Sequence, residues 1–181
     1  MQKRIALIYG TTEGQTRKIA EHVAQALRKA GADVALMHAA ELPLDWTPAN
    51  SDAIVVAASV HQAQVQPYVR DFVERHADDL NAMPTALVLV SLNAALGEMA
   101  DVPPPEYAKA LRDQTGWSPT VVEHAAGALR YTEYNWLKRM VMRKIAGDQG
   151  MSTDTSRDVE FTDWEALDRF AKAFHDVLRT A

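Results

Sequence analysis

The chain has 181 residues, of which 48% are hydrophobic and 24% are charged, a balance typical of a globular domain and not of a disordered chain. Its formal net charge is −5 at pH 7; a general nucleic-acid binder normally carries a basic excess, so nucleic acid is not an expected partner. The sequence contains no cysteine, which excludes disulfides, thiolate catalysis and cysteine-ligated metal centres. Any redox chemistry must therefore use a bound cofactor.

The N-terminal apolar stretch, residues 5–9, is far shorter than the core of a signal peptide or a membrane-spanning helix. No other window reaches about 18 uncharged apolar residues in a row, which is the length that a spanning helix needs. We therefore expect a cytoplasmic protein that is at most peripheral on the inner face of the cell membrane.

Short apolar runs rich in β-branched residues recur along the chain, and they predict strands that are covered on both faces. In chain order these runs span residues 5–9, 34–37, 53–58, 86–92 and 120–126. Helical patterns separate them, the first over residues 19–27 before the capping residue Gly31, the others over 66–81, 105–115 and about 163–178. Because strand–helix–strand crossovers are right-handed, the alternation predicts an α/β doubly wound three-layer sandwich with a five-stranded parallel sheet.

The alternation of strands and helices stops between residues 131 and 161. Residues 134–146 predict a helix there, and a polar loop containing glycines follows it. The chain has no internal repeat and no linker long enough to divide it. We therefore expect a single domain over residues 1–181 with a helical insertion at about 131–161, after the fifth strand.

The most informative segment is the loop Thr11-Thr12-Glu13-Gly14-Gln15-Thr16, which lies between the first strand and the first helix. Backbone N–H groups and the helix dipole stabilise an anion at such a position, and three threonine hydroxyls add further donors. The loop has neither the Gly-Lys-Ser/Thr ending of a triphosphate loop nor a Gly-x-Gly-x-x-Gly dinucleotide motif. It therefore predicts a site for one terminal phosphate monoester. The alternative is an ordinary polar turn with Thr12 or Glu13 near the helix cap.

Two further loops follow predicted strands, Ser59-Val60-His61-Gln62 after the third and Ser91-Leu92-Asn93-Ala94-Ala95 after the fourth. Ligands of open α/β sheets bind beyond the carboxyl ends of the strands, where the strand order reverses. The three loops should meet at that edge, and together they predict a flavin pocket. His61 is either a proton donor near the flavin or a histidine that faces solvent.

The loop Thr11–Thr16 resembles the flavodoxin phosphate loop, Thr/Ser-x-Thr-Gly-x-Thr, with Glu13 as a departure from that pattern. Within that superfamily, almost the whole chain is similar to the menaquinone-dependent protoporphyrinogen IX dehydrogenase family of bacterial haem biosynthesis. The most specific stretch is Ala126-Gly127-Ala128-Leu129-Arg130-Tyr131, followed by Tyr134, Trp136, Arg139, Met140 and Phe161-Thr162-Asp163-Trp164. The resemblance implies a flavodoxin-like sheet in the order 2-1-3-4-5.

This resemblance also implies an FMN enzyme that oxidises protoporphyrinogen IX and reduces a respiratory quinone, menaquinone or ubiquinone. Residues 11–16 would hold the FMN phosphate, and the other two loops would border the isoalloxazine ring. Arg130 and Arg139 are candidates to hold a porphyrin propionate, because arginine matches a carboxylate with two donors. No side chain is assigned as an obligatory catalytic acid or base, and the spacing of the histidines predicts no metal site. The sequence does not indicate an oligomeric state.

Two features depart from the family pattern. His61-Gln62 stands where an aromatic residue is expected to cover the flavin, and residues 97–106 are acidic where basic residues are expected to attract a dianionic tetrapyrrole. Three alternatives therefore stay open. They are a flavodoxin-type electron carrier that docks a protein partner through its acidic surface, an NAD(P)H:quinone reductase, and a binding module without catalytic activity.

The predicted insertion has a local excess of positive charge. Residues 130–147 contain five basic residues, Arg130, Lys138, Arg139, Arg143 and Lys144, against the single acid Glu133. Apolar residues share one face of the predicted helix, and aromatic residues lie at its start, as in helices that rest on a membrane surface. The alternative is an amphipathic helix packed on the sheet with its charges in water.

We predict that anionic liposomes retain the protein at low salt and release it at high salt, because each basic residue near an anionic surface contributes about 1 kcal/mol and salt screens that attraction. Co-sedimentation at the two salt concentrations measures the effect. A protein that stays in the supernatant under both conditions has no electrostatic membrane contact.

Overall fold

The computed structural model describes residues 2–43, 45–61, 64–96, 100, 102–129 and 159–180. Its central sheet contains β1 (Arg4–Gly10), β2 (Asp33–His38), β3 (Ala53–His61), β5 (Thr85–Ser91) and β6 (Val121–Ala126). These strands lie in the order β2-β1-β3-β5-β6, and every neighbouring pair is parallel. The predicted order 2-1-3-4-5 is therefore confirmed, with β5 and β6 as the fourth and fifth of the predicted strands.

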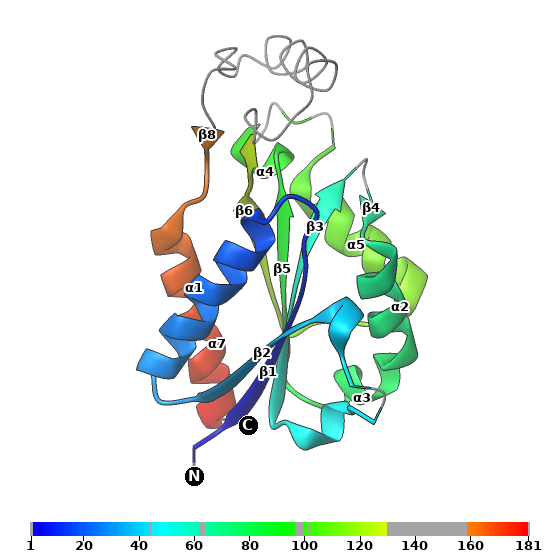
Figure 1. Cartoon of the computed structure of the whole chain (residues 1–181), viewed down its shortest axis with the longest axis vertical. Helices are drawn as coiled ribbons and strands as arrows, with labels where there is room; N and C mark the ends of the chain where they lie inside the picture. The colour runs from blue at the N-terminus through cyan, green and yellow to red at the C-terminus, as the bar shows by residue number, and fades with distance from the viewer. Residues whose placement is uncertain are drawn as a thin grey trace.

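The register brings the carboxyl ends of four strands to one edge of the sheet. Gly10 at the end of β1 pairs with Ala58 of β3, and Ser59 of β3 pairs with Val90 of β5. Ser91 at the end of β5 pairs in turn with Ala126, the last residue of β6. Both chain termini lie at the opposite end of the molecule (Figure 1). Any loop that follows one of these strands therefore faces the loops that follow its neighbours.

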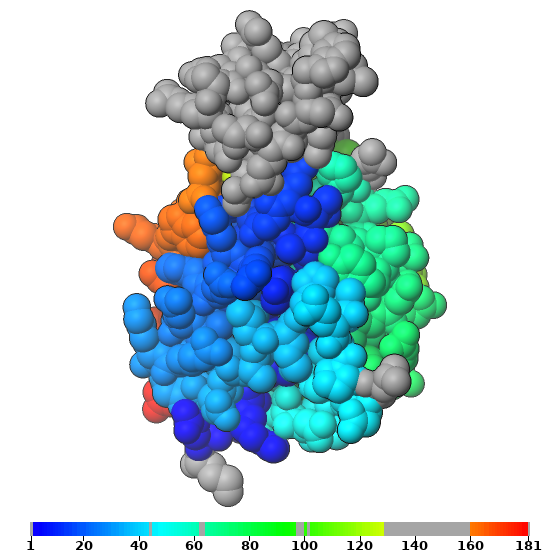
Figure 2. All heavy atoms as spheres, viewed as in Figure 1, coloured from blue at the N-terminus to red at the C-terminus, as the bar shows by residue number. Residues whose placement is uncertain are grey.

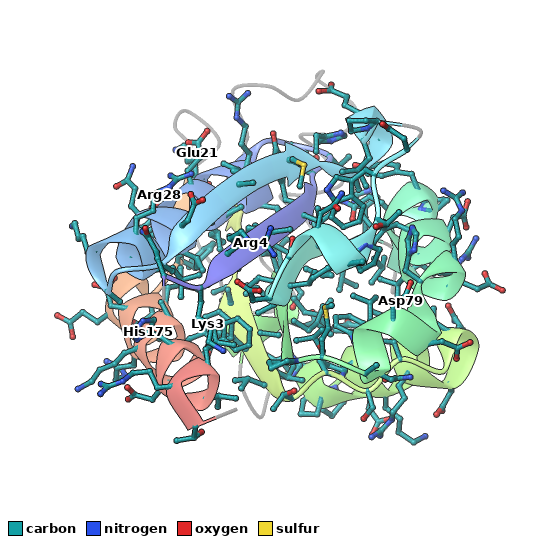
Figure 3. The ribbon with its side chains drawn as sticks, turned by 90° about the horizontal axis from the view of Figure 1, so that it is seen from below. Lys3, Arg4, Glu21, Arg28, Asp79 and His175 are labelled. Carbon is teal, nitrogen blue, oxygen red and sulfur yellow. The ribbon has the colours of Figure 1, made fainter. Side chains whose placement is uncertain are left out.

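Two layers of helices cover the sheet. Helices α1 (Gln15–Lys29) and α7 (Trp164–Thr180) pack on one face, and α2 (Pro67–Arg75), α3 (Ala77–Asn81) and α5 (Pro104–Thr115) pack on the other. The end-on view shows this sandwich, with Arg28 and His175 on the first layer and Asp79 on the second (Figure 3). In the space-filling view, α1 adjoins the start of α7 on one flank, and α2 lies on the other (Figure 2).

The central strands are apolar throughout because they bury side chains on both faces. Leu7 and Val55 belong to the core under α1 and α7, whereas their neighbours Ile8 and Ile54 belong to the core under α2 and α5. All four are fully buried, and each such side chain contributes about 1.5–3 kcal/mol relative to an exposed one. This is the physical reason why the nearly continuous apolar runs predicted a parallel sheet correctly.

Helix α1 ends as the sequence predicts. Its last residue is Lys29, and Gly31 follows in the left-handed region with a φ of 101°. The Gly31 N–H donates to the carbonyl of Arg28 at 3.0 Å, which satisfies one of the carbonyls left over at the helix end. The chain then enters β2 directly.

The prediction of one continuous helix over residues 66–81 is wrong. The chain leaves helical geometry at His76, where φ is −113°, and this residue divides α2 from α3. Its ring packs 5.1 Å from the ring of Phe72 and 6.1 Å from that of Trp46, measured between centroids. The contact with Trp46 comes from a distant part of the chain, which a local helical pattern does not include, and Leu80 of α3 stays fully buried.

Four short elements, two of them paired with each other, were not expected from the sequence. Strand β4 (Gln64–Val65) pairs antiparallel with the end of β3, and α4 (Asn93–Leu96) forms within the loop predicted after the fourth strand. Strand β7 (Ala128–Leu129) pairs with β8 (Val159–Glu160). The predicted helix 134–146 and the rest of 130–158 lie outside the described residues. No helix in the described part of the chain is long and apolar enough to cross a bilayer.

Gly10 is required by close packing. A Cβ atom at this position would overlap Cγ2 of Val69 and would lie 3.0 Å from Cε2 of Tyr68. We predict that Gly10→Ala lowers the free energy of unfolding by about 1–3 kcal/mol, the usual cost of overpacking a well-filled core. Chemical denaturation measures the change.

The double variant Gly10→Ala/Val69→Ala is the matched control, because Val69→Ala removes the atom that the new methyl group would meet. The cost of Gly10→Ala should be smaller in the Val69→Ala background than in the native protein. Equal costs in the two backgrounds would mean that this contact is not the cause of the destabilisation.

Candidate active site

A cleft opens at the edge of the sheet where the strands end. Its free space of about 570 Å³ includes part of the open solvent at its mouth. Residues of four chain segments line it: Thr11, Thr12, Glu13, Gln15, Thr16, Ser59, Val60, His61, Val90, Ser91, Leu92, Gly127 and Ala128. The structure thus brings together the three loops that the sequence analysis selected.

The first of these loops turns into α1 without a side-chain cap. Gly14 occupies the N-cap position in the left-handed region, with a φ of 85°, and no side chain caps the helix. Thr12 and Glu13 directly precede this residue, and neither caps the helix with its side chain. The Gly14 N–H donates to Oγ1 of Thr11 at 2.9 Å, which closes the loop on itself. The first N–H groups of a helix have no acceptor within it, and here they lie at Gln15 and Thr16, beside the cleft.

Thr16 carries a hydroxyl that lacks a partner within the described part of the chain. The residue is only 1% exposed, and its Oγ1 atom is fully buried. A buried hydroxyl without a hydrogen bond costs free energy of about 1–3 kcal/mol. Its neighbour Gln15 donates from Nε2 to the Thr162 hydroxyl at 2.9 Å, and that hydroxyl donates to the Ala126 carbonyl at 2.8 Å. These two hydrogen bonds connect the loop to the end of β6.

Besides that of Thr11, three hydroxyls around the cleft accept hydrogen bonds from the protein. The side-chain amide of Gln66 donates to Oγ1 of Thr12 at 3.2 Å and also to Oγ of Ser59. Oγ of Ser91 accepts from the N–H of Ala94 at 3.1 Å. A hydroxyl that accepts through its oxygen keeps its own hydrogen to donate. The cleft is therefore rich in donors and suits a ligand rich in acceptors.

The remaining wall of the cleft is apolar and was partly missed by sequence reasoning. Val60 and Leu92 belong to the predicted loops, whereas Val90, Gly127 and Ala128 do not. Residues 127–128 directly follow the fifth predicted strand, so the rule that ligands bind beyond strand ends could have identified them. The Gly127 N–H donates to the Ser91 carbonyl at 3.1 Å, which holds the ends of β5 and β6 together beyond the sheet.

Several of the predicted site residues do not line the cleft. Gly14 shapes the loop without facing the free space, and Asn93, Ala94 and Ala95 belong to the segment that forms α4. The Asn93 side chain donates away from the cleft, to the Tyr107 hydroxyl at 2.8 Å and to the Val102 carbonyl at 3.1 Å. The positions of Gln62, Arg130 and Arg139 lie outside the described residues.

The lining of the cleft carries little charge. None of its described residues is Lys or Arg, and its ionisable side chains are Glu13 and His61. Within the described lining, the groups that can hold an anion are therefore hydroxyls and backbone dipoles. Across the described ranges, no group of three or more His, Asp or Glu side chains is arranged to hold a metal ion.

Comparison with known proteins assigns the class of the chain. A family model described as a flavodoxin domain matches residues 6–156. Among solved structures, an archaeal flavodoxin superposes with a TM-score of 0.57 at 14% identity and covers 97% of this chain and 99% of its own. Oxidised flavodoxin 1 from Bacillus cereus gives 0.58 at 13% identity, with 96% and 97% covered. The fold and the model together define a flavodoxin-domain protein.

Curated relatives narrow this class. A protein of Escherichia coli K12 named protoporphyrinogen IX dehydrogenase (quinone) is 36% identical over 168 residues, which are 92% of this chain and 91% of the relative. A Leishmania major protein of the same name is 29% identical over 171 residues, which are 93% of this chain and 73% of the relative. The chain therefore belongs to the quinone-dependent protoporphyrinogen IX dehydrogenase family, as the resemblance of its sequence indicates.

The unpartnered hydroxyl of Thr16 leads to a prediction about stability. We expect Thr16→Val to leave the free energy of unfolding of the ligand-free protein unchanged or to raise it by up to about 1 kcal/mol, because a methyl group replaces a buried hydroxyl that forms no bond. Denaturation in urea measures the change.

Thr85→Val is the matched control, because the Thr85 hydroxyl is equally buried but accepts from Nε1 of Trp117 at 3.1 Å. This variant leaves the indole N–H unpaired and should cost about 1–3 kcal/mol. Equal losses in the two variants would mean that the Thr16 hydroxyl stabilises the fold and is not reserved for a ligand.

Proposed function

We propose that this chain binds FMN in the cleft and oxidises protoporphyrinogen IX to protoporphyrin IX, with menaquinone or ubiquinone as the electron acceptor. The observation that carries the proposal is the cleft with its many donors at the uncapped start of α1. The chain that forms this cleft is 36% identical to an enzyme named for the same reaction.

The phosphate group of FMN fits the start of α1. The buried Thr16 hydroxyl has no partner among the described residues and lies beside the first N–H groups of the helix. The Thr11 hydroxyl accepts from Gly14 and so keeps its hydrogen to donate. Helix N-termini bind phosphate through such N–H groups and through the helix dipole. Within the described lining, the phosphate would thus be held by hydroxyls and N–H groups.

The isoalloxazine ring would lie farther along the cleft, between the ends of β3 and β5. Val60 and Leu92 offer apolar surface there, and Ser59 and Ser91 offer hydroxyl hydrogens. FMN supplies hydride acceptance and electron transfer when it is bound, and the protein orients it and sets its electronic environment. Because the cleft is open to solvent, the porphyrinogen and the quinone can reach the same exposed side in turn.

Each turnover would remove a hydride and a proton from the substrate and convert one quinone to its quinol, so the six-electron oxidation of protoporphyrinogen IX to protoporphyrin IX would take three turnovers. No described side chain is assigned as an obligatory acid or base. His61 is exposed at the end of β3 and lines the cleft, so it can hold or release a proton near the ring. Water can also take up or supply these protons, because the cleft is open to solvent.

Residues 129 and 159, on either side of the segment 130–158, pair with each other in the β7–β8 ladder. Ala128 lines the cleft, and its partner across the β7–β8 pair is Glu160. We place the contacts of Arg130 and Arg139 with the porphyrin propionates, and the peripheral contact with an anionic membrane, in this segment. Both would bring a membrane-dissolved quinone and an anionic substrate to the same opening.

Anaerobic mixing tests the reaction. Protein loaded with FMN is mixed with protoporphyrinogen IX while the flavin absorbance is followed. We expect the absorbance to bleach and to return when quinone is added. Protoporphyrin IX is the control. It is already oxidised and cannot reduce the flavin, so it should leave the absorbance unchanged.

Two other results would point to other functions. Bleaching by NAD(P)H but not by protoporphyrinogen IX would indicate a nicotinamide-fed quinone reductase. A bound flavin that neither reductant bleaches would indicate an electron carrier. Protein that does not quench the fluorescence of added FMN would remove the cofactor assignment itself.

A further inference from the structure

The start of α2 contacts the loop of residues 11–16. After β3 the chain folds back as a small hairpin in which Val60 pairs with Val65 and His61 pairs with Gln64. This reversal carries the next residue, Gln66, back to Ser59 near the end of β3. The start of α2 is therefore placed by the same strand whose end lines the cleft.

The turn is rigid for local reasons. Pro67 occupies the first helical position, where its ring fixes φ and its missing N–H is not needed. The Gln66 carbonyl accepts from the N–H groups of Val69 and Arg70, both at 3.0 Å. Gln66 itself is only 8% exposed. The main chain at Gln66 is thus fixed, and its side chain starts from a buried position.

Gln66 joins two loops of the cleft. Its Nε2 atom carries two hydrogens, and it donates to Oγ1 of Thr12 at 3.2 Å and to Oγ of Ser59. Both hydroxyls line the cleft, one in the loop before α1 and the other at the end of β3. The amide therefore sets the distance between these loops and leaves both hydroxyl hydrogens directed elsewhere.

Tyr68 holds the same loop through its main chain. Its hydroxyl accepts from the N–H of Thr11 at 3.1 Å and lies 3.2 Å from the Thr11 carbonyl, to which it donates. The ring approaches closely because Gly10 has no Cβ. Burial raises the pKa of the Tyr68 hydroxyl above its ordinary value, so the group stays protonated and keeps its donor at neutral pH.

These contacts select which donors of the loop face a ligand. The Thr11 N–H is occupied by Tyr68, and the Gly14 N–H is occupied by the Thr11 hydroxyl. The first N–H groups of α1 and the threonine hydroxyls remain for the ligand. We propose that Gln66 and Tyr68 are positioning residues that make the cleft select phosphate-bearing FMN over riboflavin. This inference rests on the proposed binding of FMN.

Flavin discrimination tests the proposal in flavin-free protein titrated separately with FMN and riboflavin by fluorescence quenching. Tyr68→Phe keeps the ring and removes the hydroxyl, and Gln66→Met keeps the length and removes both donors. Each variant should weaken FMN binding by about 3- to 10-fold, the factor expected for one or two neutral hydrogen bonds. Riboflavin binding should stay within about twofold of the native value, because riboflavin has no phosphate to position.

Thr85→Val is the control for a general loss of stability, since Thr85 lies at the far end of β5 from the cleft. It should leave the ratio of the two affinities unchanged. Phosphorus NMR of bound FMN gives a second readout, in which the resonance should move in Tyr68→Phe but not in Thr85→Val. If one of the two positioning variants does not fold, the ratio of FMN to riboflavin affinity in the other variant still tests the proposal.

The outcomes separate this proposal from the one on which it rests. Native protein that binds neither flavin contradicts the cofactor assignment, and the positioning roles fall with it. Native protein that prefers FMN, with both variants keeping the native ratio, overturns the positioning roles alone. A rise in FMN affinity in Tyr68→Phe also overturns them, because it would mean that the tyrosine withholds a donor from the phosphate.

Discussion

The start of helix α1 is the constraint around which the cleft is built. A helix begins with N–H groups that it cannot satisfy itself, and here Gly14 provides no side chain to cap them. The parallel register places the ends of β3, β5 and β6 around this point. The buried Thr16 hydroxyl adds another unsatisfied donor at the same place. The fold thus concentrates unpaired donors where an anion can satisfy them, and it does so without a cationic side chain in the described lining.

The sequence predicts the parts of this arrangement that depend on local pattern. Apolar runs covered on both faces indicate the strands, and Gly31 marks the end of α1. The loop of residues 11–16 is recognisable because its residue types match the chemistry of a helix N-terminus. The rule that parallel strands end at one edge then brings the later loops to the same cleft.

Features that depend on tertiary contact could not be predicted in this way. The break at His76 coincides with the packing of its ring on Trp46, a residue from a distant part of the sequence that a local helical pattern does not include. The role of Tyr68 depends on an approach to residue 11 across 57 positions of sequence. Gln66 reaches Ser59 only because β4 reverses the chain. No short motif records such meetings, so the site is predictable at its loops and not in the layer that supports them.

The β7–β8 pair has a consequence for how this family can vary. The two strands hold residues 129 and 159 side by side, so the intervening chain closes a loop whose ends are already fixed by the fold. For a flexible connection, the entropic cost of bringing the two ends together grows only with the logarithm of the length, by about 0.6 kcal/mol per doubling. Insertions, deletions or replacements in this segment should therefore cost the sheet little stability. A single scaffold can in this way serve different substrates or surfaces through a module attached at one stem.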